Sequence, residues 1–234
     1  MKLLLENWRQ YLNEAAKSAE ELPDGVYVRI SDSPGADPDA PEPAWFKGRS
    51  NLAQRLAPAA IAGIRIEYVD KIYAEPRING YILIVDGSEG PGFESQPCGG
   101  AYAVGASEAD HGWGPLLYDI AMEYATEAAG GLTPSSAYVS SDAQKVWDYY
   151  LHKRSHEVER HQLDDPDNTL TPEDEDNCHQ YSSQRRSGWL GLLIPDKLQG
   201  VDWKSWDNPL SKRYTKAPTT IQKLKSLDKL EISL

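Results

Sequence analysis

The hydrophobic pattern of this chain switches repeatedly between the period of a helix and the period of a strand. Apolar side chains recur every three to four positions over residues 2–20, which predicts an amphipathic N-terminal helix that ends before the Pro-Asp-Gly turn of 23–25. Further helices are predicted over 50–60, 115–129, 141–154 and 219–227. Strands are predicted over 25–31, 64–73, 78–85, 98–107 and 230–234. This mixture is typical of an α/β (α+β) protein.

Three segments follow neither period. Residues 32–44 hold four prolines and are expected to form an exposed loop. Residues 157–176 carry nine acidic side chains and two prolines, which indicates a long solvated loop insertion. Residues 185–209 mix tryptophan with glycine and proline, which indicates irregular structure packed on the body. The predicted organisation is an N-terminal helix (1–22), a core (23–155), an irregular excursion (156–210) and a C-terminal helix and strand (211–234).

The charge balance narrows the classes of partner. The chain has 36 acidic and 24 basic residues and a net charge of −12. This excess repels nucleic-acid phosphates and anionic lipids, so neither a nucleic acid nor a membrane is expected as a partner. No apolar run approaches the ~20 residues of a membrane-spanning helix, and the N-terminus lacks the pattern of a secretory signal.

The two cysteines favour a reducing environment. Cys98 and Cys178 are 80 residues apart, and neither has a second cysteine nearby in the sequence. We therefore expect free thiols rather than a disulfide framework. With the absence of a predicted membrane span or signal, this predicts a cytoplasmic protein.

The most informative unit is the predicted strand 98–107, the turn 108–114 and the predicted helix 115–129. A glycine-bearing turn between a strand and a helix presents backbone N–H groups and the positive helix end to an anion, typically a phosphate. Gly112 and Gly114 allow the backbone to approach such a ligand closely. A tight turn without a ligand is the alternative, because a Gly-x-Gly before a helix is a weak signal by itself.

The residues around this turn add specificity. The stretch VGASEADHGWGPLL resembles the acetyl-CoA-binding motif of the GNAT superfamily of N-acetyltransferases, Val-x-Pro-x-x-Arg/Gln-x-x-Gly-x-Gly/Ala. The stretch SSDAQKVWDYY at 140–150 is similar to the Asn-x-x-Ala-x-x-Leu/Phe-Tyr segment that follows in that family. The resemblance covers about the middle half of the chain. It implies a GNAT-like mixed, twisted sheet flanked by helices, with the N-terminal helix and the acidic loop as additions.

The resemblance also implies a binding site for acetyl-CoA as co-substrate. Val104 matches the strand valine whose main chain meets the thioester, and the amides of 110–114 would hold the phosphates together with His111. The implied cofactor-binding residues are Val104, Gly105, Asp110, His111, Gly112, Trp113 and Gly114. The chain departs from the family at Ala106, Ala109 and Pro115, and no Lys or Arg lies between 78 and 144.

The reaction that the resemblance implies is transfer of an acetyl group to an amine on a small molecule or a protein. The amine must be neutral to attack, so a base is needed. Glu108 is the candidate base beside Asp110, and Tyr150 is the candidate acid ahead of Tyr149, because Trp147 occupies the position of the usual tyrosine. The alternatives are surface solvation for the carboxylates and core packing for the tyrosines.

Two further interpretations stay open. The acidic loop approximates the ligand spacing of a calcium-binding loop, but Leu170 stands where glycine is needed, so a solvated loop is preferred and no metal is expected. The opening MKLLLENWRQYLNEAA is similar to N-terminal tags of tailed-phage proteins, some of which direct proteins into the capsid. A phage-encoded acyltransferase in the host cytoplasm is therefore one hypothesis. A non-catalytic, virion-associated structural or interaction protein on the same fold is the other.

Overall fold

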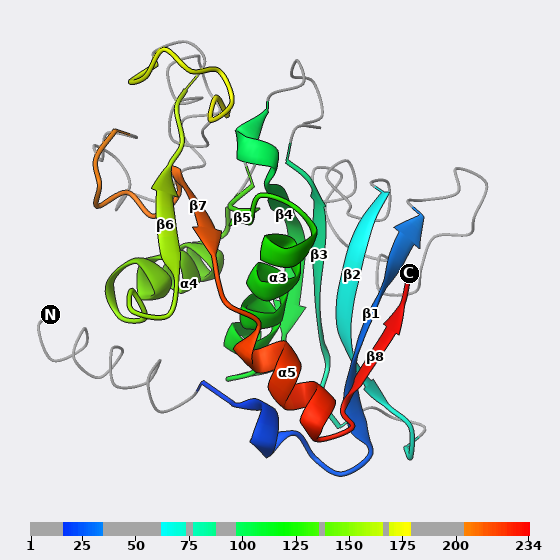
Figure 1. Cartoon of the computed structure of the whole chain (residues 1–234). Coiled ribbons are helices and arrows are strands. Elements are labelled where there is room, and N and C mark those ends of the chain that lie inside the picture. Colours follow the sequence, from blue (N-terminus) through cyan, green and yellow to red (C-terminus); the bar gives the residue numbers. More distant parts are fainter. Residues whose placement is uncertain are drawn as a thin grey trace, which may run out of the picture.

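The computed structural model describes residues 16–34, 62–73, 77–87, 97–135, 139–165, 169–178 and 204–234. The predicted helix at 50–60 and most of the predicted N-terminal helix lie outside these ranges. Eight strands form one sheet in the order β6-β7-β5-β4-β3-β2-β1-β8, and helices α3 and α5 lie across one face of it (Figure 1). The fold is thus a mixed α/β sheet with helices packed on it.

The strands and helices lie close to their predicted positions. The strands are β1 (Val26–Pro34), β2 (Ala62–Asp70), β3 (Gly80–Asp86), β4 (Tyr102–Ala109), β5 (Leu132–Thr133), β6 (Glu159–Gln162), β7 (Lys212–Thr215) and β8 (Leu230–Ser233). The helices are η1 (Ala19–Glu21), η4 (Cys98–Gly100), α3 (Gly114–Ala128), α4 (Ser141–His152) and α5 (Thr219–Ser226). All five predicted strands are present, whereas β5, β6 and β7 were not predicted.

The sheet combines two kinds of pairing. Strands β1 to β4 form an antiparallel meander, and β8 joins the far side of β1 in parallel. Strand β5 follows α3 and pairs with β4 in parallel, as a crossover through a helix allows. Strand β7 lies between β5 and β6 and is antiparallel to both. The C-terminal part of the chain therefore completes the sheet on both sides.

Helix α3 is the centre of the core. Its predicted buried face consists of Leu116, Leu117, Ile120, Ala121, Tyr124 and Ala125, and all of these are buried except Tyr124, which is only partly buried. The opposite face is buried as well, because α5 and β7 pack against the helix. The polar residues Asp119 and Glu123 therefore lie in the interior, 6% and 0% exposed. Other elements thus enclose most of this helix, and its exposed residues Glu127 and Ala128 lie at its C-terminal end.

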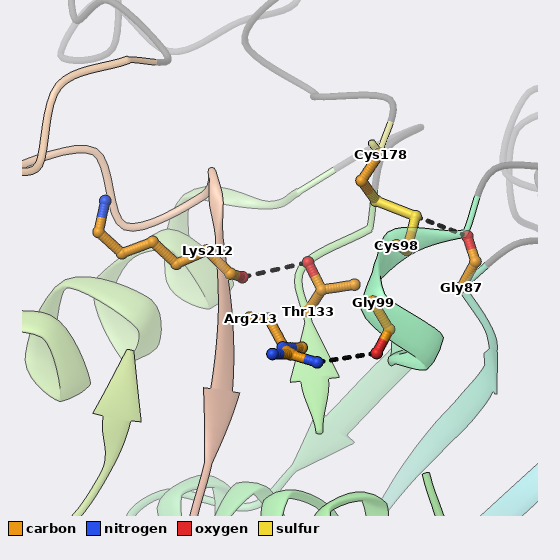
Figure 2. The surroundings of a disulfide bond; sticks show 7 residues. All are labelled: Gly87, Cys98, Gly99, Thr133, Cys178, Lys212 and Arg213. Carbon is orange, nitrogen blue, oxygen red and sulfur yellow. Dashed lines mark hydrogen bonds between the residues drawn. A yellow bond between two sulfur atoms is a disulfide. The ribbon is translucent and has the colours of Figure 1, made fainter. Parts of the chain in front are cut away.

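The structure corrects the expectation of free thiols. Cys98 and Cys178 form a disulfide, with their Cα atoms 4.5 Å apart. Figure 2 shows the bond beside η4, where Cys98 Sγ also contacts the carbonyl oxygen of Gly87 at 3.3 Å. The 80-residue separation misled the interpretation, since the sheet brings both segments to the same place. Among the described helices, none is long and apolar enough to cross a bilayer.

Two other expectations are wrong in part. The acidic stretch 157–176 is not a purely solvated loop, because it contains β6 and the buried residues Asp164 and Asp165. The N-terminal segment is not wholly separable from the sheet, because Ala19 and Leu22 are buried in the core. Any independent N-terminal tag must end before these residues.

Candidate functional site

Strand β4 carries an irregularity at its centre. Its register against β3 pairs Leu83 with Ala106 but Ile84 with Val104, so Gly105 is an extra residue on β4. Such a bulge bends the strand and leaves the extra residue outside the ladder. Gly105 is exposed, and a Cβ there would lie 3.2 Å from the side chain of Val85. The bulge is therefore a position that favours glycine.

Strands β4 and β5 part soon after they meet. They pair only at Tyr102 with Leu132 and at Ala103 with Thr133, whereas β4 continues beside β3 as far as Ala109. Residues 104–109 of β4 therefore have no ladder partner on the β5 side among the described residues. Backbone N–H and C=O groups that lack a ladder partner need another acceptor or donor, from side chains, water or a ligand.

The turn after β4 is tightly braced. Asp110 and Asn79 form two reciprocal hydrogen bonds, because the Asp110 N–H donates to the Asn79 carbonyl and the Asn79 N–H donates to the Asp110 carboxylate, both at 2.8 Å. The Trp113 N–H donates to the Asp110 carbonyl at 3.1 Å, and the Lys17 N–H donates to the Gly112 carbonyl at 2.9 Å. The amides of Asp110 and Trp113, which we expected to hold phosphates, thus donate within the chain instead.

Gly112 and the start of α3 keep the features expected of an anion site. Gly112 has φ 84°, a left-handed conformation that favours glycine. The residue before α3, Trp113, makes no side-chain capping bond. The N–H groups in the first turn of a helix have no partner within the helix, and the helix dipole is positive there. Pro115 has no N–H, so Gly114, Leu116 and Leu117 are the donors of this turn.

A buried tyrosine holds the inner side of the turn 108–114 against the core. Tyr68 on β2 packs edge-on against Trp113, with ring centroids 5.6 Å apart, and donates its hydroxyl hydrogen to the Trp113 carbonyl at 2.8 Å. Burial raises the pKa of Tyr68 well above its usual value, so its hydroxyl stays a donor. Glu108, Asp110 and His111 are exposed on the outer side of the same turn.

The two predicted catalytic residues lie in different environments. Glu108 is exposed on β4 and stands opposite Tyr81 in the ladder. Tyr150 is completely buried, with its hydroxyl 2.9 Å from the Asp119 carboxylate and 3.2 Å from the Pro115 carbonyl oxygen. Burial and the neighbouring Asp119 raise its pKa well above the usual value. The Tyr150 hydroxyl therefore contacts the first two turns of α3 rather than the surface of the turn 108–114.

Trp147 is fully buried in an aromatic stack. Its ring lies 5.5 Å from that of Tyr118 on α3 and 4.9 Å from that of Tyr214 on β7. These three rings fill the space between α3, α4 and β7. An indole in this position cannot supply a proton to a leaving thiolate.

A pair of hydroxyl groups that was not predicted joins β4 to α3. Ser107 Oγ is 3.1 Å from the Tyr118 hydroxyl, in the part of β4 that β5 does not cover. Burial raises the pKa of Tyr118 to about 12, in spite of the opposing bond with Ser107. The sequence carries no signal for this pair, because the two residues belong to different elements and meet only when α3 packs on β4.

A buried ionic cluster joins α3 to the C-terminal elements. Glu123 accepts hydrogen bonds from the backbone N–H groups of Thr220 and Ile221, at 2.8 and 2.7 Å, and also pairs with Lys216. Its carboxylate therefore caps the start of α5 from outside that helix. Asp119, one turn earlier on α3, pairs with Arg154 at 2.8 Å, and Lys216 lies 3.6 Å away. Burial raises the pKa of Asp119 against the effect of these two cations.

A cavity of about 720 Å³ opens at the other end of α3. Among the described residues, its lining includes Asp32, Asp86 and Tyr102 and no lysine or arginine. The remaining lining residues are Ser33, Ala62, Gly63, Ile64, Pro97, Gly100, Ala101 and Ala129. Because α3 ends at this cavity, its carbonyl groups add negative potential. The cavity thus suits a cationic ligand better than an anionic one.

Comparisons with known proteins identify no relative: no family model, curated protein or solved structure matches the chain. Within the described ranges, no group of three or more His, Cys, Asp or Glu side chains is placed to hold a metal ion. The functional argument therefore rests on the geometry of β4, the turn and the cavity.

Proposed function

We propose that the protein is a CoA-dependent N-acyltransferase that moves an acetyl group from acetyl-CoA to an amine. The observation that carries this proposal is that β4 separates from β5 before it reaches the glycine-containing turn that leads into α3. The resemblance of residues 104–117 and 140–150 to the GNAT superfamily supports the same function. A mixed sheet with parallel β4 and β5 around a central helix is compatible with that fold.

The proposed cofactor site follows the course of β4. The pantetheine arm of CoA contains amide groups, which pair well with a strand edge that lacks a partner. That edge comprises residues 104–109 and includes Val104 and the bulge at Gly105. The diphosphate would lie against the amides of Gly112, Gly114 and the first turn of α3. Asp110 acts against phosphate binding through its charge, so the amide donors must outweigh it.

The proposed reaction is direct. The amine nitrogen attacks the thioester carbonyl carbon, the new C–N bond forms as the C–S bond breaks, and the thiolate takes up a proton. Glu108 is an exposed carboxylate within this edge and would accept the proton of the attacking amine. Tyr150 is our predicted acid, but its hydroxyl is held by Asp119, so the Ser107–Tyr118 pair is the better-placed proton source.

The acidic cavity gives the proposal a place for the acceptor. Strand β4 begins at the cavity, at Tyr102, and ends at the turn, at Ala109. A cofactor that lies along β4 with its phosphates at the turn would direct its acyl group toward the cavity. Asp32 and Asp86 would attract an ammonium group from solvent before it loses its proton.

Calorimetry and thermal shift with acetyl-CoA test the proposal. A ligand at a hundred times its dissociation constant should raise the free energy of unfolding by about 2.7 kcal/mol. Gly112→Val should abolish binding, because a branched side chain at φ 84° strains the turn and enters the ligand's path. Gly25→Val is the control for backbone strain, since Gly25 has φ 83° but belongs to the turn before β1, where the nearest atoms to a Cβ are those of the exposed Ile72 side chain. This control should bind acetyl-CoA as the wild type does. Retained binding in Gly112→Val, or no heat with millimolar acetyl-CoA, would exclude the site.

A second function has its own supporting observation. The chain itself occupies part of the turn, through the bonds of Lys17 to Gly112 and of Asp110 to Asn79. This favours a non-catalytic structural or interaction protein on the same fold, virion-associated if the chain is phage-encoded. Under this alternative acetyl-CoA does not bind, and a fusion of residues 1–15 to a reporter should be incorporated into capsids. A reporter that stays outside the capsids would remove the support for a tag.

A further inference from the structure

The disulfide holds an acidic segment against the sheet. Residues 169–178, which we call the acidic segment, end at Cys178 beside η4 (Figure 2). The Cys98 N–H donates to the Asn177 carbonyl at 2.9 Å, and the Gly99 N–H donates to the Glu175 carbonyl at 2.6 Å. Cys98 and Cys178 are 1% and 5% exposed and pack with Leu163 in a small separate apolar cluster. The contact is thus one disulfide, a few backbone bonds and little apolar area.

The η4 side of this contact has a conformation that depends on its neighbours. Cys98, Gly99 and Gly100 have φ values of 48°, 60° and 70°, three left-handed residues in succession. Such a run is unfavourable for a cysteine and persists only when surrounding contacts maintain it. Arg213 contributes one of these contacts, at 2.8 Å from the Gly99 carbonyl oxygen, and Gly130 N–H contributes another, at 3.0 Å from that of Gly100.

Like charges oppose the docking of the acidic segment. Its residues Glu173, Asp174, Glu175 and Asp176 carry four consecutive carboxylates. Burial and the nearby charges of Asp164, Glu173 and Glu175 raise the pKa of Asp176. Among the described residues, no cation forms an ion pair with positions 173–176.

We propose that the disulfide is a redox-controlled latch that keeps the acidic segment docked on η4, and that its reduction releases the segment. The reductant is a dithiol. One thiolate attacks a sulfur of the Cys98–Cys178 bond and forms a mixed disulfide, and the second thiolate displaces the remaining cysteine. Two electrons pass from the dithiol, which becomes a disulfide, and the protein gains two thiols. Because both sulfurs are buried, exchange must follow a local opening.

Release of the segment changes the cavity as well. Pro97, Gly100 and Ala101, which flank or belong to η4, line its wall. Loss of the Glu175 and Asn177 contacts leaves the left-handed run without its support on that side. The state of the latch therefore affects the shape of the cavity, whichever ligand the cavity takes.

Hydrogen exchange on the full chain tests the latch. We expect dithiol-reduced protein to exchange the amides of Cys98, Gly99 and residues 170–178 at least about tenfold faster than oxidised protein, because those bonds then open locally. Residues 116–125 of α3 serve as the internal reference and should not change. Cys178→Ser should behave like the reduced protein and avoids a change at the left-handed Cys98. Unchanged exchange after reduction, or equal acceleration in α3, would overturn the proposal.

Charge variants test why the segment leaves. In the reduced protein, Glu173→Gln/Glu175→Gln/Asp176→Asn should restore slow exchange, because the repulsion is removed while the backbone bonds remain. The control Glu127→Gln/Glu159→Gln/Asp228→Asn removes the same net charge at exposed positions outside the segment. It should leave fast exchange unchanged. Equal protection by both triple variants would refute a local electrostatic cause.

Discussion

The molecule buries carboxylates in two places and stabilises them in different ways. Beneath α3, Asp119 and Glu123 meet Arg154, Lys216 and the first amides of α5. In the acidic region, the Asp164 carboxylate accepts hydrogen bonds from the N–H groups of Leu170 and Thr171 and from the Thr171 hydroxyl. Among the described residues, positions 173–176 form no ion pair. The first cluster is held by opposite charge and the second by a covalent bond nearby.

The comparison shows what burial of charge requires. A desolvated carboxylate costs several kcal/mol unless cations or oriented N–H groups replace the lost water. Glu123 receives both, so it joins elements that are about 95 residues apart in sequence. Asp176 is only partly buried and one of its carboxylate oxygens has no hydrogen-bond partner among the described residues, while the disulfide at Cys178 connects its segment to η4. The first arrangement is permanent, whereas the second depends on the redox state.

Removal of the central cation should have the largest effect. Lys216→Met leaves Glu123 buried without its ionic partner, which should lower the free energy of unfolding by about 3–5 kcal/mol. Lys223→Met is the control, because its bridge to Glu20 at 2.9 Å is solvent-exposed and should contribute about 0–1 kcal/mol. Urea denaturation of both variants measures the difference. A similar decrease in the free energy of unfolding in both variants would show that Lys216 contributes no more to stability than a residue of a surface ion pair.

Loss of the disulfide should follow in magnitude. Cys178→Ser should lower the free energy of unfolding by about 2–4 kcal/mol, because the cross-link no longer restricts the unfolded chain. In wild-type protein, a dithiol should lower the free energy of unfolding, measured by chemical denaturation, by the same amount as the substitution. In the variant, a dithiol should cause no decrease. A variant as stable as oxidised wild type would indicate that the thiols are not paired in solution.

The Tyr150 hydroxyl should matter less, but measurably. Tyr150→Phe removes a donor from the buried Asp119 and should cost about 1–2 kcal/mol. Tyr149→Phe, on the neighbouring half-buried ring, should stay within about 0.5 kcal/mol. If the protein proves to be an acyltransferase, the kcat of both variants, measured under conditions where they are folded, separates a proton donor from a structural hydroxyl. A selective loss of kcat in Tyr150→Phe without loss of stability would favour the catalytic role.

The last comparison concerns a cation that is buried without a carboxylate partner among the described residues. Lys212 Nζ is held by the carbonyl of Asn208 at 2.9 Å and by Gln162 Oε1 at 3.1 Å, and burial lowers its pKa from 10.5 to about 8. The unfolded chain therefore binds this proton more tightly, so stability should decrease as the pH falls from about 10.5 to about 8 and level off below. Lys212→Met should lose this slope and Lys223→Met should keep it. Parallel pH profiles of all three proteins would contradict the assignment.

The local sequence was sufficient for the elements that follow one clear period. The helical spacing placed α3 and its apolar face, and the alternation placed β1, β2 and β3 within a few residues. Gly112 was identified as a turn residue that allows close approach of the backbone to a ligand, and the structure adds that it has φ 84°. These features depend on neighbours in the chain, and backbone geometry expresses them wherever the segment lies.

Tertiary packing decided the features on which the proposals rest. The pairing of Cys98 with Cys178, the insertion of β7 beside β5 and the burial of Asp119 and Tyr150 all join residues that are far apart in sequence. Strands of two to four residues, such as β5 and β7, are too short to show a period, and they form only because an existing sheet edge offers them partners. From the sequence alone, a carboxylate in a helix is expected to face solvent. Only the tertiary structure shows which elements cover it and which cations on those elements pair with it.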